Sequence, residues 1–256
     1  MRWKHRLNIA VALSTLLIVI LIFHDSPYLW LWILFVISNF CVFLVFGIVF
    51  LRFQYFYPSI FRNIGPEVIL TFDDGPDPVV TPRILDTLQK HGIKAIFFVI
   101  GHKAQDHPEI LHRIISEGHT IGNHTQNHSL FFAMLHSEKI AEEIDLFTQN
   151  IEPLVSEKIT IFRPPIGYTN PKIARALRRR KFKIVAWSVR SYDSFKNKES
   201  LMNRLMKTRP GSIVLLHDNL AQTADILDDY ITQSKANGII FANQEHLKKF
   251  IHEINK

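Results

Sequence analysis

The chain has 256 residues, 47% of them hydrophobic, and a formal net charge of +7 at pH 7. This length allows one sizeable domain with additional segments. The excess of basic residues is too small to indicate nucleic-acid binding, and the single cysteine, Cys41, excludes an intrachain disulfide and a cysteine-based metal site.

Two long apolar segments occupy the N-terminal region. Residues 7–23 and 28–51 contain no charged side chain and are separated by a turn at 24–27. The second segment exceeds the roughly 20 residues needed to span a bilayer, and the first is near the lower limit. We therefore expect residues 1–52 to form a membrane anchor of two transmembrane helices. A signal-peptide core and a buried soluble helix pair are the alternatives, although no small-x-small cleavage site follows the first segment.

The basic residues around these segments indicate an orientation. Arg2, Lys4 and Arg6 precede the first segment, Arg52 and Arg62 follow the second, and the turn carries no Lys or Arg. By the positive-inside rule, both ends of the hairpin face the cytoplasm. We therefore expect a protein integral to the bacterial cytoplasmic membrane, with its main domain cytoplasmic. The domain would be extracytoplasmic if only one segment spans the membrane.

The rest of the chain predicts alternating strands and helices. The aromatic segment 53–65 is typical of an interfacial linker, and a domain follows at 66–256. Predicted strands lie at 68–72, 94–101, 120–124, 159–165, 182–188, 211–218 and 239–242. Predicted helices lie at 81–92, 108–119, 137–154, 170–180, 198–208, 223–238 and 244–254. Roughly seven successive βα units indicate a parallel sheet, either closed as a barrel or open.

A basic run, RALRRRKFK, stands out at 175–183. It fits the solvated C-terminal end of a helix, where cations interact favourably with the helix dipole. Contact with anionic lipid or with a substrate phosphate is the alternative. The sequence leaves both interpretations open.

Polar side chains with catalytic potential follow several predicted strands. They are Asp73, Asp74, His124, Arg163, Ser188 and His217. Because the C-terminal ends of parallel strands meet at one edge of the sheet, these groups can converge on one pocket. One helical turn would put His124 and His128 on a common face, and two imidazoles with one carboxylate suit zinc. One of the adjacent acids can then bind metal while the other remains free as a base that activates water.

Each of these residues also has a structural interpretation when it is taken singly. Asp73 and Asp74 could make Asx-turn or helix N-cap hydrogen bonds. His217 could be a buried histidine with a hydrogen-bond partner, and Arg163 could be an ordinary surface arginine at a strand end. The combination of motifs favours the functional interpretation.

Together the motifs resemble those of the NodB-homology polysaccharide deacetylases, carbohydrate esterase family 4, over about residues 66–245. The matching stretches are TFDDGP at 71–76, HTQNH at 124–128, FRPPIG at 162–167 and LLH at 215–217. The resemblance implies an α/β fold, a distorted (β/α) barrel of about seven units. It also implies a metal-dependent hydrolase that removes an N-acetyl or similar small acyl group from an amino sugar by cleaving a non-peptide amide bond.

The resemblance assigns the acid, the base and the metal ligands. It implies that Asp73 is the general base and that His217 protonates the leaving amine. It assigns one divalent metal to Asp74, His124 and His128. We expect zinc, with cobalt, nickel and manganese as alternatives.

The resemblance also implies supporting roles for five residues. Arg163 would pair with Asp193 and so tune the base. The backbone N–H of Ile166 would stabilise the oxyanion, and the side chains of Leu215 and Trp187 would contact the substrate. A backbone donor is retained although the family usually has tyrosine where this chain has isoleucine.

The fourth motif, WSVRSYDSF at 187–195, departs from the family pattern. Arg190 replaces an acid, and Ser194 replaces a tryptophan that helps to wall the acyl pocket. Phe195 or Trp187 would have to supply the missing wall, so the size of the acyl group stays open. Arg190 could add a cation for a phosphate-bearing substrate.

The expected partners are an amino-sugar substrate and membrane lipids, and no nucleic acid. A cytoplasmic domain would meet a lipid-linked sugar, whereas an outward-facing one would meet peptidoglycan or exopolysaccharide. An O-acetyl esterase or a deformylase could use the same site. A non-catalytic membrane module that binds glycans is a further alternative.

Overall fold

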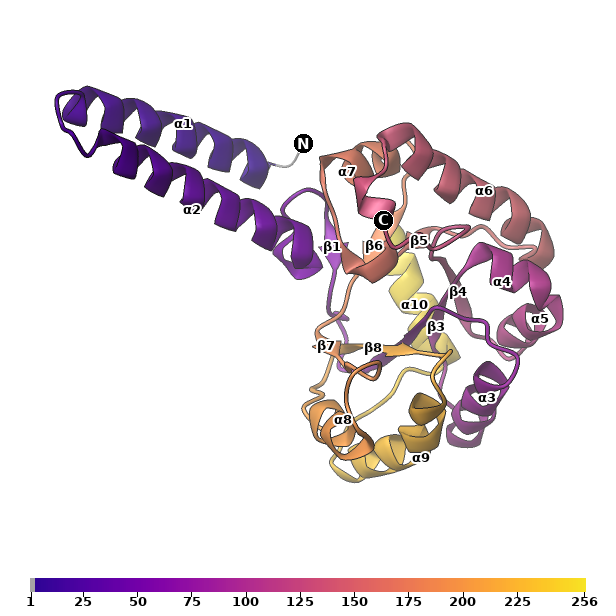
Figure 1. Cartoon of the computed structure of the whole chain (residues 1–256). Coiled ribbons are helices and arrows are strands. Elements are labelled where there is room, and N and C mark those ends of the chain that lie inside the picture. Colours follow the sequence, from indigo (N-terminus) through magenta and orange to yellow (C-terminus); the bar gives the residue numbers. More distant parts are fainter. Residues whose placement is uncertain (1–2) are drawn as a thin grey trace.

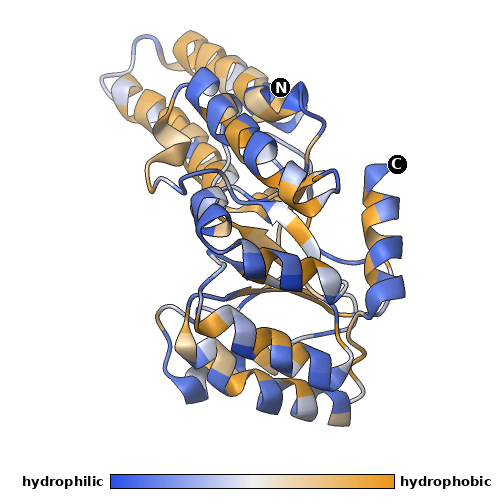
Figure 2. Cartoon of the chain, turned by 90° about the vertical axis from the view of Figure 1, so that its right-hand side faces the viewer, coloured by the Kyte–Doolittle hydropathy of each residue, from blue (hydrophilic) through white to orange (hydrophobic). Residues whose placement is uncertain are grey.

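The computed structural model describes residues 3–256 and has two parts, a helical hairpin and an α/β domain (Figure 1). Arg2, which entered the orientation analysis, lies outside the described residues. The hairpin consists of α1 (Trp3–Phe23) and α2 (Leu29–Val49), which run antiparallel away from the domain. Both helices are long and apolar enough to cross a membrane. Their surfaces are hydrophobic almost all round, unlike those of the domain helices (Figure 2).

The domain is built on one parallel sheet of eight strands in the order β1-β6-β5-β4-β3-β2-β8-β7. The strands are β1 (Ser59–Ile60), β2 (Ile69–Asp73), β3 (Ile96–Val99), β4 (Thr120–Asn123), β5 (Ile161–Phe162), β6 (Lys183–Val185), β7 (Val189–Arg190) and β8 (Ile213–His217). Each pairing is parallel. The sheet curls but β1 and β7 do not pair with each other, so the expected distorted barrel is an open one.

Helices cover the sheet on both sides (Figures 1 and 2). The longer ones are α3 (Val80–His91), α5 (Pro108–Ser116), α6 (Ser137–Val155), α7 (Pro171–Arg178), α8 (Lys198–Leu205), α9 (Ala221–Ala236) and α10 (Gln244–Asn255). The short ones are α4 (Gly101–Asp106) and the 3-10 turns η1 (Leu51–Phe53), η2 (Phe132–Met134) and η3 (Pro165–Gly167). The apolar faces of α3, α5, α6, α7, α8 and α9 form the main core with alternate residues of the buried strands, such as Leu70 and Phe72. The apolar face of α10 packs on the other side of the sheet, in a second cluster that includes Ile69 and Phe98.

Local signals explain several boundaries. Gly92 ends α3 with φ of 67°, a left-handed conformation that glycine adopts without a steric penalty. Asn170 begins α7, where its side-chain oxygen accepts a hydrogen bond from the backbone N–H of Ile173. Pro171 occupies the first helical position, which needs no intrahelical N–H.

The structure differs from the sequence expectations at four short elements. β1 lies inside the expected linker 53–65, where Ser59 is in register with Ile184 at the edge of the sheet. α4 and the two-residue β7 were not expected. The strand expected at 239–242 is reduced to a single bridge between Phe241 and Val68, the residue that precedes β2, and α10 begins three residues after Phe241.

Candidate active site

The C-terminal ends of β2, β4, β5 and β8 lie at one end of the sheet, because all the strands run parallel. β2 and β8 are neighbours, and Asp73 is in register with His217. β4 leads directly into His124 and β5 into Arg163, whose backbone N–H donates to the carbonyl of Asn123. Groups from distant parts of the sequence therefore lie at one end of the sheet.

The two adjacent acids have different partners. Oδ1 of Asp73 accepts a hydrogen bond of 2.6 Å from Arg163. Oδ1 of Asp74 lies 3.4 Å from Nε2 of His124 and 3.2 Å from Nε2 of His128. Asp74 has φ of 73°, so the chain leaves β2 in a left-handed conformation. The two carboxylates stay close together, since Oδ2 of Asp73 lies 3.9 Å from the same Nε2 of His124.

Asp74, His124 and His128 form a possible metal site, because one ligand atom from each lies within 4.8 Å of the others. Nδ1 of His124 is 2.7 Å from the carbonyl oxygen of Arg163. A carbonyl only accepts, so Nδ1 carries the proton and Nε2 presents its lone pair to the site. This tautomer and the donor set fit zinc.

The protonation states favoured at Asp74 and His128 also suit the binding of a metal cation. Burial would raise the pKa of Asp74, but the neighbouring imidazoles of His124 and His128 lower it overall. Burial lowers the pKa of His128, and the charge of His124 adds to this effect. An anionic carboxylate and neutral imidazoles are the forms that bind metal.

The expected helical turn at 124–128 is wrong. The segment is a loop in which Thr125 and His128 have φ of 72° and 48°. The Thr125 hydroxyl oxygen accepts a hydrogen bond from the backbone N–H of His128 and closes the loop. The ring centroids of His124 and His128 are 4.7 Å apart, so the loop brings the rings together without a helix.

Arg163 is completely buried and fully occupied by polar partners. Its guanidinium donates to Asp73, to the hydroxyl of Thr71 at 2.8 Å and to the carbonyl of Val185 at 2.9 Å. It also lies 4.1 Å from the ring centroid of Phe98. The structure thus rules out a surface arginine and shows how Asp73 is held in one orientation.

The expected pair of Arg163 with Asp193 is wrong. Asp193 pairs instead with His217, at 2.6 Å between Oδ1 and Nδ1. Its Oδ2 accepts from the backbone N–H of His217 and from the hydroxyl of Thr223, both at 2.8 Å. The sheet order explains the difference, because β7 and β8 are neighbours whereas β5 lies on the far side of β2.

The contact with Asp193 raises the pKa of the His217 imidazole and so favours its protonated form. Burial would lower the pKa of His217, but the hydrogen bond and charge of Asp193, helped by Asp73 and Asp74, raise it to about 9. Nδ1 is used by Asp193, and no other described residue is hydrogen-bonded to Nε2. The imidazolium can therefore give its Nε2 proton to a group in the site.

Ile166 has an unusual backbone conformation in η3, with φ of 62° and ψ of −9°. This conformation is rare for a β-branched residue. Its N–H donates to no backbone acceptor within residues 3–256. Gly167 follows with φ of 80°, and a Cβ there would lie 2.2 Å from the ring of Trp187. The loop therefore packs on Trp187 and leaves a backbone donor available.

The residues expected to contact the substrate or to wall the acyl pocket differ in their positions. The ring centroid of Trp187 is 5.5 Å from the guanidinium of Arg163, whereas Phe195 is 83% exposed. The guanidinium of Arg190 stacks over Trp187 at 5.7 Å. Leu215 lies in β8 with 2% of its surface exposed. Of the two proposed wall residues, only Trp187 packs against the site.

Sequence reasoning missed Asp218, a buried acid behind the two aspartates. It accepts a 2.7 Å hydrogen bond from the hydroxyl of Thr81, and its backbone N–H donates to the carbonyl of Asp73. Burial raises its pKa to about 7. A Cβ at Gly75 would lie 2.0 Å from the Asp218 carboxylate, so only glycine fits there. Its position directly after LLH was the available signal.

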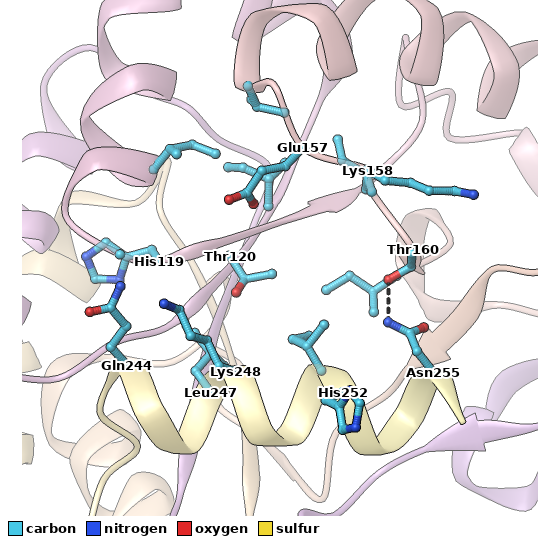
Figure 3. A pocket seen from close by; sticks show the side chains of 17 residues that line it. His119, Thr120, Glu157, Lys158, Thr160, Gln244, Leu247, Lys248, His252 and Asn255 are labelled. Atoms are coloured by element: carbon cyan, nitrogen blue, oxygen red, sulfur yellow. Dashed lines mark hydrogen bonds between the residues drawn. The ribbon is translucent and has the colours of Figure 1, made fainter.

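A separate hollow lies at the opposite end of β4 and β5, between these strands and α10 (Figure 3). His119, Lys248 and His252 are among the side chains that line it. Because these residues precede β4 or belong to α10, none of the strand-end acids or their partners is there.

The family model for polysaccharide deacetylases matches residues 62–185. The chain is 35% identical over 193 residues to a peptidoglycan-N-acetylglucosamine deacetylase of Bacillus cereus, an alignment that covers 72% of this chain and 89% of that protein. It is 32% identical over 186 residues to the peptidoglycan-N-acetylmuramic acid deacetylase PdaA of Bacillus subtilis, covering 70% of each.

Solved structures share the fold. Peptidoglycan deacetylase PdaC from Bacillus subtilis matches with a TM-score of 0.66 and 31% identity over 74% of this chain and 93% of that chain. A CE4 family pseudoenzyme from Bacillus anthracis matches with a TM-score of 0.68 and 27% identity over 78% of this chain and 69% of that chain. The fold thus occurs in a pseudoenzyme as well, so the site residues have to support the activity.

Proposed function

The chain belongs to the polysaccharide deacetylases, carbohydrate esterase family 4, and from this premise we propose that it is a membrane-anchored, metal-dependent deacetylase of peptidoglycan amino sugars. The single observation that carries the proposal is the convergence of three groups at one end of the sheet. They are the Asp74–His124–His128 cluster, the Arg163–Asp73 pair and the Asp193–His217 pair. A pseudoenzyme would be expected to lack at least one of them.

Each residue group has a role that follows from its contacts. A divalent metal held by Asp74, His124 and His128 would supply Lewis-acid activation of water and of the amide carbonyl. Asp73, oriented by Arg163, accepts the proton of the attacking water. The backbone N–H of Ile166 donates to the developing oxyanion. His217 then gives its Nε2 proton to the amine, which would otherwise be a poor leaving group.

The relatives support peptidoglycan as the substrate class, since they are named as deacetylases of its N-acetylglucosamine or N-acetylmuramic acid residues. This substrate would put the domain outside the cytoplasmic membrane. The basic residues that flank the hairpin support a second candidate, a lipid-linked amino sugar reached from the cytoplasm. A reporter active only in the cytoplasm, fused to the C-terminus, distinguishes the two.

The experiment that tests the activity measures acetate release from peptidoglycan and N-acetylglucosamine oligomers by the purified full chain. Chelation should abolish release, and zinc or cobalt should restore it. Full activity in a metal-free sample would contradict metal dependence. Formate release or faster cleavage of O-acetyl sugars would instead identify a deformylase or an esterase.

A further inference from the structure

A basic surface on α7 and the turn after it takes no part in the proposed chemistry. We call it the α7 basic surface, and it comprises Arg175, Arg178, Arg179, Lys181 and Lys183. The first four are exposed and Lys183 is half-buried. The sequence has no Asp or Glu from 158 to 192, so the positive charge is not diluted locally.

These five cations make no ion pair within residues 3–256. Arg180 lies in the same run but pairs with Asp145 and is therefore not counted. Glu138 on α6 is near enough to Arg175 to interact electrostatically without forming an ion pair. Two further lysines, Lys158 and Lys256, line the hollow beside the turn at 179–183. The surface thus presents several cations that have no ion-pair partner among the described residues.

Helix α7 lies beside the base of the hairpin (Figure 1). Tyr55 and Phe56, which follow α2, pack against Ala174 on the buried side of α7. The hydroxyl of Tyr57 donates a 2.9 Å hydrogen bond to the carbonyl of Phe182, in the middle of the basic turn. Phe56 also shares a small hollow with Arg178. The cations are therefore fixed next to the aromatic segment that leaves the apolar helices.

We propose that the α7 basic surface binds the anionic headgroups of membrane lipids around the hairpin. This inference rests on the membrane anchoring proposed above. Clustered Lys and Arg next to a transmembrane segment are attracted to anionic lipid, and Tyr side chains prefer the interface between membrane and water. Since α7 is packed on the hairpin base, the contact holds the domain with its α7 side against the bilayer.

The test uses the full chain in nanodiscs of phosphatidylcholine with or without phosphatidylglycerol. An amine-acetylating reagent labels lysines, and mass spectrometry compares Lys181 and Lys183 with the reference Lys90 on α3. We expect labelling of the two basic-surface lysines to slow about threefold or more only in anionic discs, and to recover in high salt, which screens surface charge. Equal labelling in both kinds of disc would overturn the inference.

Matched variants connect the effect to the charges. R175Q/R178Q/R179Q should lose the protection of Lys181, whereas K198Q/K207Q/K235Q, which removes three exposed cations near α8 and α9, should keep it. Protection by inorganic phosphate in neutral discs would assign the surface to free phosphate and overturn the lipid contact. Acetate release reports separately on catalysis, and retention of the chain in the discs reports on anchoring. Loss of retention would contradict the anchoring itself, whereas equal labelling of a retained chain would contradict only the lipid contact.

Discussion

At the scale of single residues, the two aspartates at the end of β2 have different partners, which supports the separate roles proposed for them. Asp73 is bound to a buried arginine, and Asp74 faces two imidazoles. Both carboxylates lie near Nε2 of His124, at 3.9 Å for Asp73 and 3.4 Å for Asp74, so their other partners distinguish them. Substitution of each acid should therefore have a different consequence.

Asp74→Asn should lower metal occupancy, because it removes the only carboxylate of the ligand set. Asp73→Asn should keep the metal and lose roughly 100-fold or more in kcat/KM, the usual contribution of a general base. Metal content is measured by elemental analysis of purified variants, and kcat/KM by acetate release. Equal metal loss in both variants would show that the two roles are wrongly assigned.

The Asp193–His217 pair predicts the alkaline limb of the pH profile. His217 works as an acid only when protonated, so kcat/KM should fall as the pH rises through about 9. Asp193→Asn removes the main group that raises this pKa, so the limb should move down toward the ordinary value of 6.5. Thr223→Val, which removes a neighbouring donor to Asp193 but keeps the carboxylate, is the matched control. An unmoved limb in Asp193→Asn would exclude His217 as the group that titrates.

Sequence motifs pointed to the residues that the structure brings together at this end of the sheet, but they did not indicate how these residues pair. Motif order says nothing about which acid a buried arginine reaches, so Asp193 was paired with Arg163 instead of His217. The left-handed residues of the loop 124–128 carry no sequence signal such as glycine, and a helical turn was expected there. Asp218 was passed over because a single acid after a strand has no partner in the sequence pattern.

At the scale of secondary-structure elements, long periodic segments were predictable and two-residue strands were not. α3, α6 and α9 match their expected ranges closely because apolar spacing over three or more turns is a strong signal. β1 and β7 exist only because a neighbouring strand supplies the hydrogen-bond partners. Such elements depend on tertiary contacts that local composition does not report.

The left-handed backbone of Ile166 in η3 predicts that its replacement by glycine does not destabilise the fold. Holding a β-branched residue at φ of 62° costs of order 1–3 kcal/mol, and glycine relieves that cost. Ile166→Gly should therefore leave the free energy of unfolding unchanged or raise it by up to about 1 kcal/mol, while keeping the backbone N–H proposed to bind the oxyanion. Ile240→Gly, at another exposed isoleucine that lacks positive φ, should lower it by roughly 0.5–1 kcal/mol. Urea unfolding measures both, and equal losses would argue against strain at Ile166.

At the scale of the whole molecule, the hairpin is the part that the α/β domain does not bury. Most hydrophobic side chains of α1 and α2 are exposed, and neither helix contains an acidic residue; Asp25 lies in the turn between them. An exposed apolar surface of this size is unfavourable in water. Each helix has 21 residues, a length that matches the hydrocarbon core of a bilayer. The two chain ends of the hairpin lie at the same side, next to the domain.

A membrane-spanning hairpin predicts that the chain stays in the membrane fraction after an alkaline carbonate wash. It also predicts that reporters fused to the N-terminus and to the C-terminus are active on the same side. A cleaved signal sequence would instead release a chain shortened at its N-terminus, which mass spectrometry of the mature protein detects. Reporters on opposite sides would mean that only one helix spans.

The contact between α2 and the loop after η3 limits how far the candidate active site can move from the hairpin. Thr169 donates through its backbone N–H to the carbonyl of Ile48 and through its hydroxyl to that of Gly47, both in the last turn of α2. Only two residues separate Thr169 from Ile166. In an inserted chain, these two hydrogen bonds would hold the loop that contains Ile166 directly against the end of the membrane helix α2. If the hairpin is inserted as proposed, this contact would hold the site at a fixed height above the lipid, and the enzyme would deacetylate only the layer of glycan nearest the bilayer.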